Sequence, residues 1–147
     1  MSQRQLHVIY CDDVRQEVGN KQSFIGVYAA DLIVDRLPAI LPKFCVVATV
    51  STPLAQPFDN LRVRVLMDEQ CVFDTQEIVM TTAEGARAIG EPKTAAERAG
   101  DLQANIVMVL APLQIDNETT LQVVADVDGE SMRSRLLRVT QRGAPRE

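Results

Sequence analysis

The side chains best suited to covalent chemistry are the single histidine and the three cysteines of this chain of 147 residues. Any base-activated cysteine would have to use His7. Cys11 lies four residues further along the same predicted strand, roughly 13 Å away at strand rise. That separation is too long for the hydrogen bond that a base makes to its nucleophile. Cys45 and Cys71 lie inside apolar runs, so the sequence predicts buried, reduced thiols and no catalytic residue.

Several aspartates lie near predicted strand ends, where they could offer oxygen ligands to a metal ion. They are Asp12, Asp13, Asp31, Asp35, Asp126 and Asp128. A calcium site needs six or more oxygen ligands, which a tight loop with regular spacing generally supplies. The aspartates lack that spacing, and one histidine is too few for a transition-metal site. No Gly-rich phosphate loop is present either. We therefore expect no metal and no cofactor, with the aspartates acting as strand-end and turn residues.

Arginines offer a binding site of another kind. Arg62 and Arg64 alternate on one predicted strand, and Arg133 and Arg135 on another. If the two strands were neighbours, the guanidinium groups would form a basic stripe for phosphate or carboxylate groups. The alternative, which is the commoner arrangement, is that they pair with Asp and Glu on solvated faces. The net charge of −5 argues against nucleic acid and against an anionic membrane as partners.

A further group of charges lies in the connection from Asp12 to Lys21, which includes Arg15 and Glu17. This connection is either a recognition loop or a salt-linked turn that fixes the strands on each side. Mixed charges next to a strand pair favour the turn. The candidate partner-binding residues are therefore Arg15, Glu17, Arg62, Arg64, Arg133, Arg135 and Leu137.

The elements that must position these residues are predicted to be mainly β-strands. Two apolar runs, 6–11 and 23–28, flank the charged connection and predict a hairpin that is apolar on both faces and central in its sheet. Two prolines in 37–42 predict a loop that crosses from one sheet to another. Residues 43–51 form the clearest buried strand, and 61–68 alternate apolar and charged residues, as in a half-exposed strand.

The second half of the chain is predicted to continue this pattern after one interruption. Residues 81–100 lack an apolar stripe but contain a capping box, Thr94 to Glu97, which predicts one short helix in a long connection. Asp128-Gly129 is the signal for a type I′ hairpin turn. The remaining predicted strands are 71–79, 101–112, 119–128 and 130–139.

These elements predict a single all-β domain over residues 1–140, followed by a flexible tail at 141–147. The expected architecture is a mainly antiparallel β-sandwich of about eight strands, immunoglobulin-like or similar. A chain of this length buries roughly 70% of its unfolded surface and needs no disulfide or metal for stability. The N-terminal apolar run is too short for a signal peptide, and no run approaches the ~20 residues of a membrane helix. We therefore expect a cytoplasmic protein.

One stretch, CDDVRQEVGNKQSFIGVYAADL, followed by LPAILPKFCVVATV and by Pro53, Pro57 and Phe58, resembles a known family. It is similar to small bacterial and bacteriophage proteins that share a domain of unknown function. Their signature combines an Asp-rich strand end, an Arg-Gln-Glu-Val-Gly-x-Lys connection and an Ile/Val-Gly-Val-Tyr strand. The resemblance spans nearly the whole chain and is most specific from Cys11 to Tyr28. It implies a bacterial or phage origin, but no activity or site residue.

The sequence leaves two classes of function open. The first hypothesis is a non-enzymatic protein–protein binding or assembly module that self-associates or binds a bacterial partner. The alternative is a small enzyme or ligand-binding protein with a cleft near residues 81–100.

Assembly is predicted from the edges of the sandwich, because unpaired backbone groups of an edge strand invite pairing unless charges guard them. Arginines guard 61–68 and 130–139, whereas 71–79 carries only Asp74 and Glu77. The step Leu136-Leu137 breaks strict alternation, so one leucine should face outward or lie at a bulge. We therefore expect a homodimer, with Leu137 as a contact residue.

Overall fold

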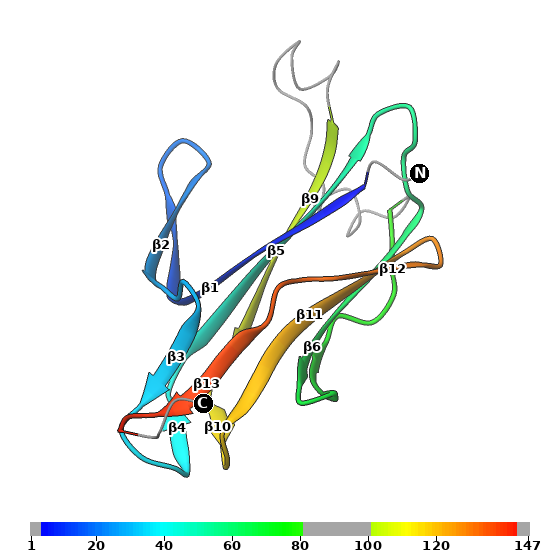
Figure 1. Cartoon of the computed structure of the whole chain (residues 1–147). Coiled ribbons are helices and arrows are strands. Elements are labelled where there is room, and N and C mark those ends of the chain that lie inside the picture. The colour runs from blue at the N-terminus through cyan, green and yellow to red at the C-terminus, as the bar shows by residue number, and fades with distance from the viewer. Residues whose placement is uncertain (1–3, 81–100, 144–147) are drawn as a thin grey trace.

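Thirteen strands and no helix make up the described part of the chain, which in this computed structural model comprises residues 4–80 and 101–143. The strands form two large sheets and one small one (Figure 1). All strand pairs are antiparallel except the pair β3–β13. The all-β, mainly antiparallel prediction is therefore confirmed. The predicted short helix and the predicted cleft near 81–100 lie outside the described residues.

The first large sheet has four strands in the order β2-β1-β5-β9. Their bounds are Gln5–Glu17 for β1, Lys21–Val27 for β2, Phe44–Pro53 for β5 and Asp101–Leu110 for β9. The predicted opening hairpin is present, but β1 extends to Glu17 and the turn is confined to 18–20. Its first strand is central, as predicted, but the second is not. β2 lies at the edge of the sheet, which leaves Ile25 43% and Val27 55% exposed.

The second large sheet has the order β3-β13-β11-β6-β7, with β12 paired to β11 and β8 paired to β6. Its strands are β3 (Asp31–Val34), β6 (Asn60–Met67), β7 (Gln70–Asp74), β8 (Ile78–Val79), β11 (Thr119–Val127), β12 (Glu130–Arg133) and β13 (Leu137–Gln141). The predicted strand 61–68 is internal here, because β6 lies between β11 and β7. The prediction from its arginines that this segment is an edge strand is therefore wrong.

The proline-rich segment crosses between the sheets, as predicted, but it is not all loop. After β2 the chain enters β3 of the other sheet, and then forms β4 (Ala39–Leu41), which pairs with β10 (Leu113–Ile115). Pro38 and Pro42 lie just outside β4. A strand of three residues accommodates them because neither proline has to donate a ladder hydrogen bond.

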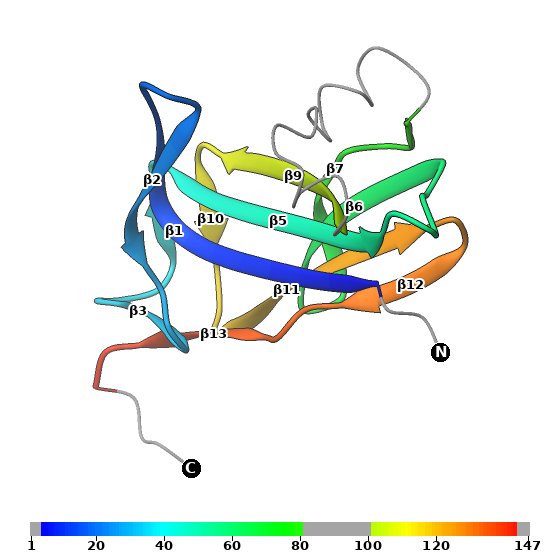
Figure 2. The same ribbon diagram turned by 90° about the horizontal axis from the view of Figure 1, so that it is seen from above.

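One large core fills the space between the two large sheets, which stack as layers (Figure 2). The four-stranded sheet contributes alternate residues of β1 and β5, among them Tyr10 and Phe44, both fully buried. The seven-stranded sheet contributes Val63 from β6 and Val123 from β11. Because the apolar faces cover each other, the arrangement is a β-sandwich.

The returning strand predicted over 130–139 is broken into β12 and β13. At the break, the Ser134 hydroxyl accepts a hydrogen bond from Val123 N at 2.9 Å, and Ser134 N donates to Val123 O at 2.9 Å. The side chain thus takes over a bond that a regular ladder gives to the backbone. The alternation resets there, so that Leu136 is 54% exposed and Leu137 is fully buried. The predicted irregularity at these leucines is therefore confirmed.

Candidate functional site: the free edge of β9

The longest uncharged strand edge belongs to β9 of the four-stranded sheet. β9 pairs with β5 along all ten of its residues, and no other described strand pairs with its opposite edge. Its sequence, DLQANIVMVL, contains one charged residue, at its first position. Long edge strands without charge, proline or bulge expose a row of N–H and C=O groups that can pair with another chain. The opposite edge of β9 is therefore the strongest candidate for a binding site.

The register of the sheet identifies which backbone groups face this edge. Tyr28 N donates to Tyr10 O at 2.8 Å, so even-numbered residues of β1 bond to β2 and odd-numbered ones to β5. The β1–β5 register pairs odd with odd residues, which leaves the even residues of β5 to bond to β9. Since Val46 lies opposite Met108, even-numbered residues of β9 bond to β5. The odd-numbered residues, from Gln103 to Val109, therefore direct their N–H and C=O groups to the free edge.

The same alternation divides the side chains of β9 between two faces. On the core side, Ala104 and Met108 are 0% and 1% exposed, whereas Ile106 between them remains partly exposed. On the outer side, Val107 packs on a second apolar cluster and Val109 is 44% exposed. Apolar side chains thus flank the free backbone groups along the core side of the strand and, at Val107 and Val109, on its outer side.

The edges formed by β7, β3 and β2 are guarded, each by a different feature. β7 has five residues, a register shift opposite it between Val65 and Leu66, and Asp74 at its end. β3 has four residues and carries Asp31, which pairs with Arg138 at 3.0 Å. β2 begins with Lys21 and contains Gly26 in a left-handed conformation, with φ at 69°. Short length, charge and irregular backbone all disfavour pairing with another strand.

The outer face of the four-stranded sheet is partly covered by its own β1–β2 hairpin. Phe24 from β2 packs on Cys11, Cys45 and Val47, which are at most 2% exposed. Further along the hairpin, the side chain of Gln22 accepts a hydrogen bond of 3.1 Å from Asn105 of β9. β2 therefore reaches across β1 and β5 to the outer side of β9, and it covers the two thiols on the way.

The root of the hairpin is fixed by the residues of the Asp-rich signature. The Tyr28 hydroxyl donates a hydrogen bond to the Asp12 carboxylate, and Lys43 Nζ lies 2.6 Å from Asp13 Oδ1. The hydrogen bond from Lys43 lowers the pKa of Asp13, while burial and the bond to Asp12 raise the pKa of Tyr28. The Asp12 side chain lies against Gly26 and occupies the space that a Cβ atom on this residue would need. The signature thus explains the shape of the hairpin, not a reaction.

Cys11 and Cys45 are buried thiols with raised pKa values. Burial raises the pKa of Cys11 to about 11, and the neighbouring Cys45 makes a smaller contribution in the same direction. Burial also raises the pKa of Cys45. The prediction of buried thiols is correct for these two and wrong for Cys71, which is exposed because β7 is an edge strand. His7 is exposed on β1 and faces Thr49 across the strand pair.

Three of the predicted arginines lie on the outer face of the seven-stranded sheet, where each pairs with an acidic residue. Arg62 lies 2.5 Å from Asp74, Arg64 2.9 Å from Asp126 and Arg133 3.3 Å from Glu69. β11 separates β6 from β12, so the predicted strands are not neighbours and the basic stripe is not formed. The alternative of solvated, paired arginines is confirmed for all three.

Arg135 lies at the break between β12 and β13, where it contacts Tyr10 and Ala29. Its guanidinium lies 5.4 Å from the centre of the Tyr10 ring and donates to the Ala29 carbonyl at 2.6 Å. The Tyr10 hydroxyl lies 3.1 Å from Ser134 Oγ and donates to the Arg135 carbonyl at 3.1 Å. These contacts tie β1 of one sheet to the broken strand of the other.

The positions of the remaining predicted site residues also differ from the prediction. Arg15 and Glu17 lie on β1 opposite Ser23 and Lys21, and neither forms an ion pair with another described residue. The predicted salt link between them is therefore absent from this part of the chain. Leu137 is fully buried in the core, so its prediction as a partner-contact residue is wrong. The break at Ser134 turns Leu136 outward in its place.

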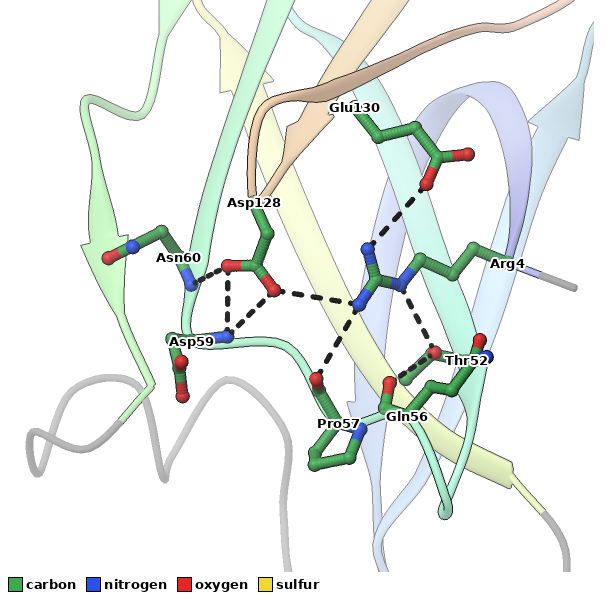
Figure 3. Close-up of polar contacts among 8 residues, drawn as sticks. All are labelled: Arg4, Thr52, Gln56, Pro57, Asp59, Asn60, Asp128 and Glu130. Atoms are coloured by element: carbon green, nitrogen blue, oxygen red, sulfur yellow. Dashed lines mark hydrogen bonds and ion pairs between the residues drawn. The ribbon is translucent and has the colours of Figure 1, made fainter. Parts of the chain in front are cut away.

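A polar corner around Arg4 was not predicted from the sequence (Figure 3). The Arg4 guanidinium lies 3.5 Å from Asp128 and 3.6 Å from Glu130, and its Nε donates to the buried Thr52 hydroxyl at 3.3 Å. Asp128 also accepts a hydrogen bond from Asn60 N at 2.9 Å. Arg4 thus joins the start of β1 to the β11–β12 turn. Only the fold brings these distant segments together.

An open hollow of about 230 Å³ lies beside this corner, between β6 and the β11–β12 turn. The carboxylates of Asp126 and Asp128 in its wall already pair with Arg64 and Arg4. Among the described residues, no group of three or more His, Cys, Asp or Glu side chains is placed to hold a metal ion.

Comparison with known proteins places the chain in a family. Residues 6–140 match the model of a family of unknown function (DUF6941), and the chain belongs to that family. A search of curated proteins and a search of solved structures each found no match. The resemblance to a domain of unknown function is thereby confirmed, and the bacterial or phage origin stays a prediction. None of the described segments forms a helix with the length and apolarity of a membrane span.

Proposed function

We propose that this protein is a non-enzymatic protein-binding module that pairs a strand of its partner with the free edge of β9. Strand addition of this kind takes its affinity from main-chain hydrogen bonds and its specificity from alternate side chains. The observation that carries the proposal is the uncharged stretch 102–110, whose odd-numbered residues direct backbone groups away from β5. The other described edges are short, charged or irregular.

Two further observations support a role without catalysis. Cys11 and Cys45 have raised pKa values and are fully buried, which is the opposite of a reactive thiol. The arginines that could have bound an anionic substrate are instead paired with Asp74, Asp126 and Glu69. Three free thiols also agree with the reducing conditions of the cytoplasm, where we propose that the protein acts.

The proposal is tested by comparing the proteins that bind to the immobilised wild type with those that bind to an immobilised variant carrying a charge in β9. In Ile106→Lys, a cation points inward from the middle of β9, which edge strands tolerate when free but not when paired. The matched control is Val18→Lys, which places the same charge at a position that is 93% exposed on the hairpin turn. Each protein is incubated with extract of the host cells, and the retained proteins, including the chain's own copies, are identified by mass spectrometry.

We expect the wild type and Val18→Lys to retain the same proteins and Ile106→Lys to lose them. Hydrogen exchange of the bound complex should then show slowed exchange at Gln103, Asn105, Val107 and Val109, whose amides face the free edge. Equal retention by all three proteins, or an empty wild-type column, contradicts the proposal.

A further inference from the structure

We propose that the partner of β9 is a second copy of this chain, paired antiparallel around a two-fold axis that passes through Ile106. This inference rests on the proposed function and names its partner. It joins the two four-stranded sheets into one continuous sheet, with β9 of each copy at its centre.

Strand geometry restricts the possible registers. The two copies are related by a two-fold axis normal to the sheet. Because side chains alternate between faces, the core faces of both copies lie on the same side of the joined sheet only if one residue lies opposite its own copy at the axis. With the axis at Ile106, this residue meets its own copy, Ala104 meets Met108 and Leu102 meets Leu110. All these side chains face the core side of β9. Contacts between large apolar side chains, and between a small and a large one, extend the two cores across the junction.

The neighbouring registers are less favourable. An axis at Asn105 pairs residues 101–109 of the two copies, so that the charged first residue of β9 enters the paired stretch. An axis at Val107 pairs residues 101–103 with 111–113, beyond the end of β9, and so shortens the ladder. The axis at Ile106 keeps residues 102–110 of both copies paired and brings no charge into the contact.

Charge explains why a second copy fits this edge and not the others. Near a two-fold axis each residue lies close to its own copy, so any charge there meets a like charge. The chain has a net charge of −5, and the edges formed by β2, β3 and β7 carry Lys21, Asp31 and Asp74. Between 102 and 110, β9 carries no charge at all. Compared with those three edges, β9 is therefore the one at which two identical acidic chains can meet without repulsion, and it is longer than the uncharged strands β4, β8 and β10.

Burial points to the same place. Ile106 faces the core side between two residues that are at most 1% exposed, yet it remains partly exposed in the single chain. Leu102, also on the core side, is partly exposed as well. A second copy would cover both side chains, and on the outer face the same register would place Val107 opposite Asn105 and Val109 opposite Gln103.

Molar mass is the first test, measured by light scattering coupled to size exclusion at tens of micromolar protein. We expect the wild type and Val18→Lys to have twice the chain mass of 16.2 kDa, and Ile106→Lys to have that mass once. Val107→Pro should also be monomeric, because it removes an N–H that faces the free edge and not one that bonds to β5. Thermal unfolding of each variant confirms that a monomer is folded. A monomeric wild type, or a folded Ile106→Lys that remains a dimer, overturns the inference.

The second test determines the register by cross-linking in a Cys71→Ser background, which removes the exposed thiol. Oxidised glutathione takes up the two electrons and two protons released when two thiols join. Ile106→Cys should give a covalent dimer, because residue 106 meets its own copy at the axis. Leu102→Cys should not, because its neighbour in the second copy is Leu110. Cross-linking at 102 and not at 106 overturns the register.

The two proposals fail in different ways. If the wild type is monomeric but retains another protein that Ile106→Lys loses, the second-copy inference fails and the binding edge stands. If the wild type is a dimer whose mass and retained proteins are unchanged in Ile106→Lys, both fail.

Discussion

The two large sheets share one core but expose very different outer sides. The outer face of the seven-stranded sheet carries ion pairs between neighbouring strands, such as Arg62 with Asp74 and Arg64 with Asp126. The four-stranded sheet has an apolar cluster on its outer face around Cys11 and Cys45, which its own hairpin covers. Its edge strand β9 has ten residues, whereas the edges of the other sheet have four and five.

This difference shows where the chain tolerates contact with another strand. Surface ion pairs contribute little to stability, with typical values of about 0–1 kcal/mol, but they make a sheet face and its edges unsuitable for apolar contact. The seven-stranded sheet is protected in this way, and the β9 edge of the four-stranded sheet is not. Binding is therefore expected on one side of the sandwich only.

The largest expected effect concerns the inward and outward leucines of the seven-stranded sheet. Leu137→Ala should lower the free energy of unfolding by about 2–5 kcal/mol, because it leaves a cavity in a fully buried part of the core. Leu136→Ala should change it by less than about 0.5 kcal/mol, since that side chain is 54% exposed. Urea unfolding of both variants measures the difference. Equal losses would mean that the break at Ser134 does not reset the alternation.

Thiol reactivity compares the covered face of one sheet with the edge of the other. Cys71 should react with a thiol reagent at least about a hundredfold faster than Cys11 and Cys45, whose reaction requires local opening of the hairpin. All three should react after unfolding. Cys71→Ser serves as the control and should abolish the fast phase. A fast phase that persists in this variant would show that the hairpin does not cover the outer face.

Gly26→Ala tests what holds the hairpin over that face. It should cost roughly 1–3 kcal/mol, because the residue has φ at 69° and an added Cβ would collide with Asp12. Gly129→Ala is the matched control, since φ is 83° there and no atom lies within 4 Å of an added Cβ. The excess loss at Gly26, measured by urea unfolding, isolates the contact with Asp12. Equal losses would argue against that contact.

The smallest effect concerns an ion pair on the seven-stranded sheet. The hydrogen bonds from Arg62 hold the pKa of Asp74 at about 2, below its ordinary value of 3.8. Because the folded state has the lower pKa, the stabilisation is present above pH 3.8 and is lost as the pH falls toward 2. Acid titration of stability in the wild type and Asp74→Asn should therefore converge over this range. Arg62→Gln should show a weaker pH dependence, and an unchanged one would exclude this pair as its cause.

The sequence by itself determined the identity and the faces of the long strands. Alternation in 61–68 correctly placed Val63 inward and Arg62 outward, because a strand side chain has a period of two. Asp128 and Gly129 have φ values of 48° and 83°, in agreement with the predicted type I′ turn. These features depend on residues close together in the chain, and local patterns are sufficient to predict them.

Only the tertiary structure decided which strands lie next to each other. β9 was correctly predicted as a strand, but its free edge was missed, although the uncharged stretch 102–110 was visible in the sequence. The same applies to the internal position of β6, the exposure of Cys71 and the pairing of Arg4 with Asp128. The physical reason is that neighbours in a sheet are selected by packing and backbone pairing between distant segments, which leave no periodic signal in either segment alone.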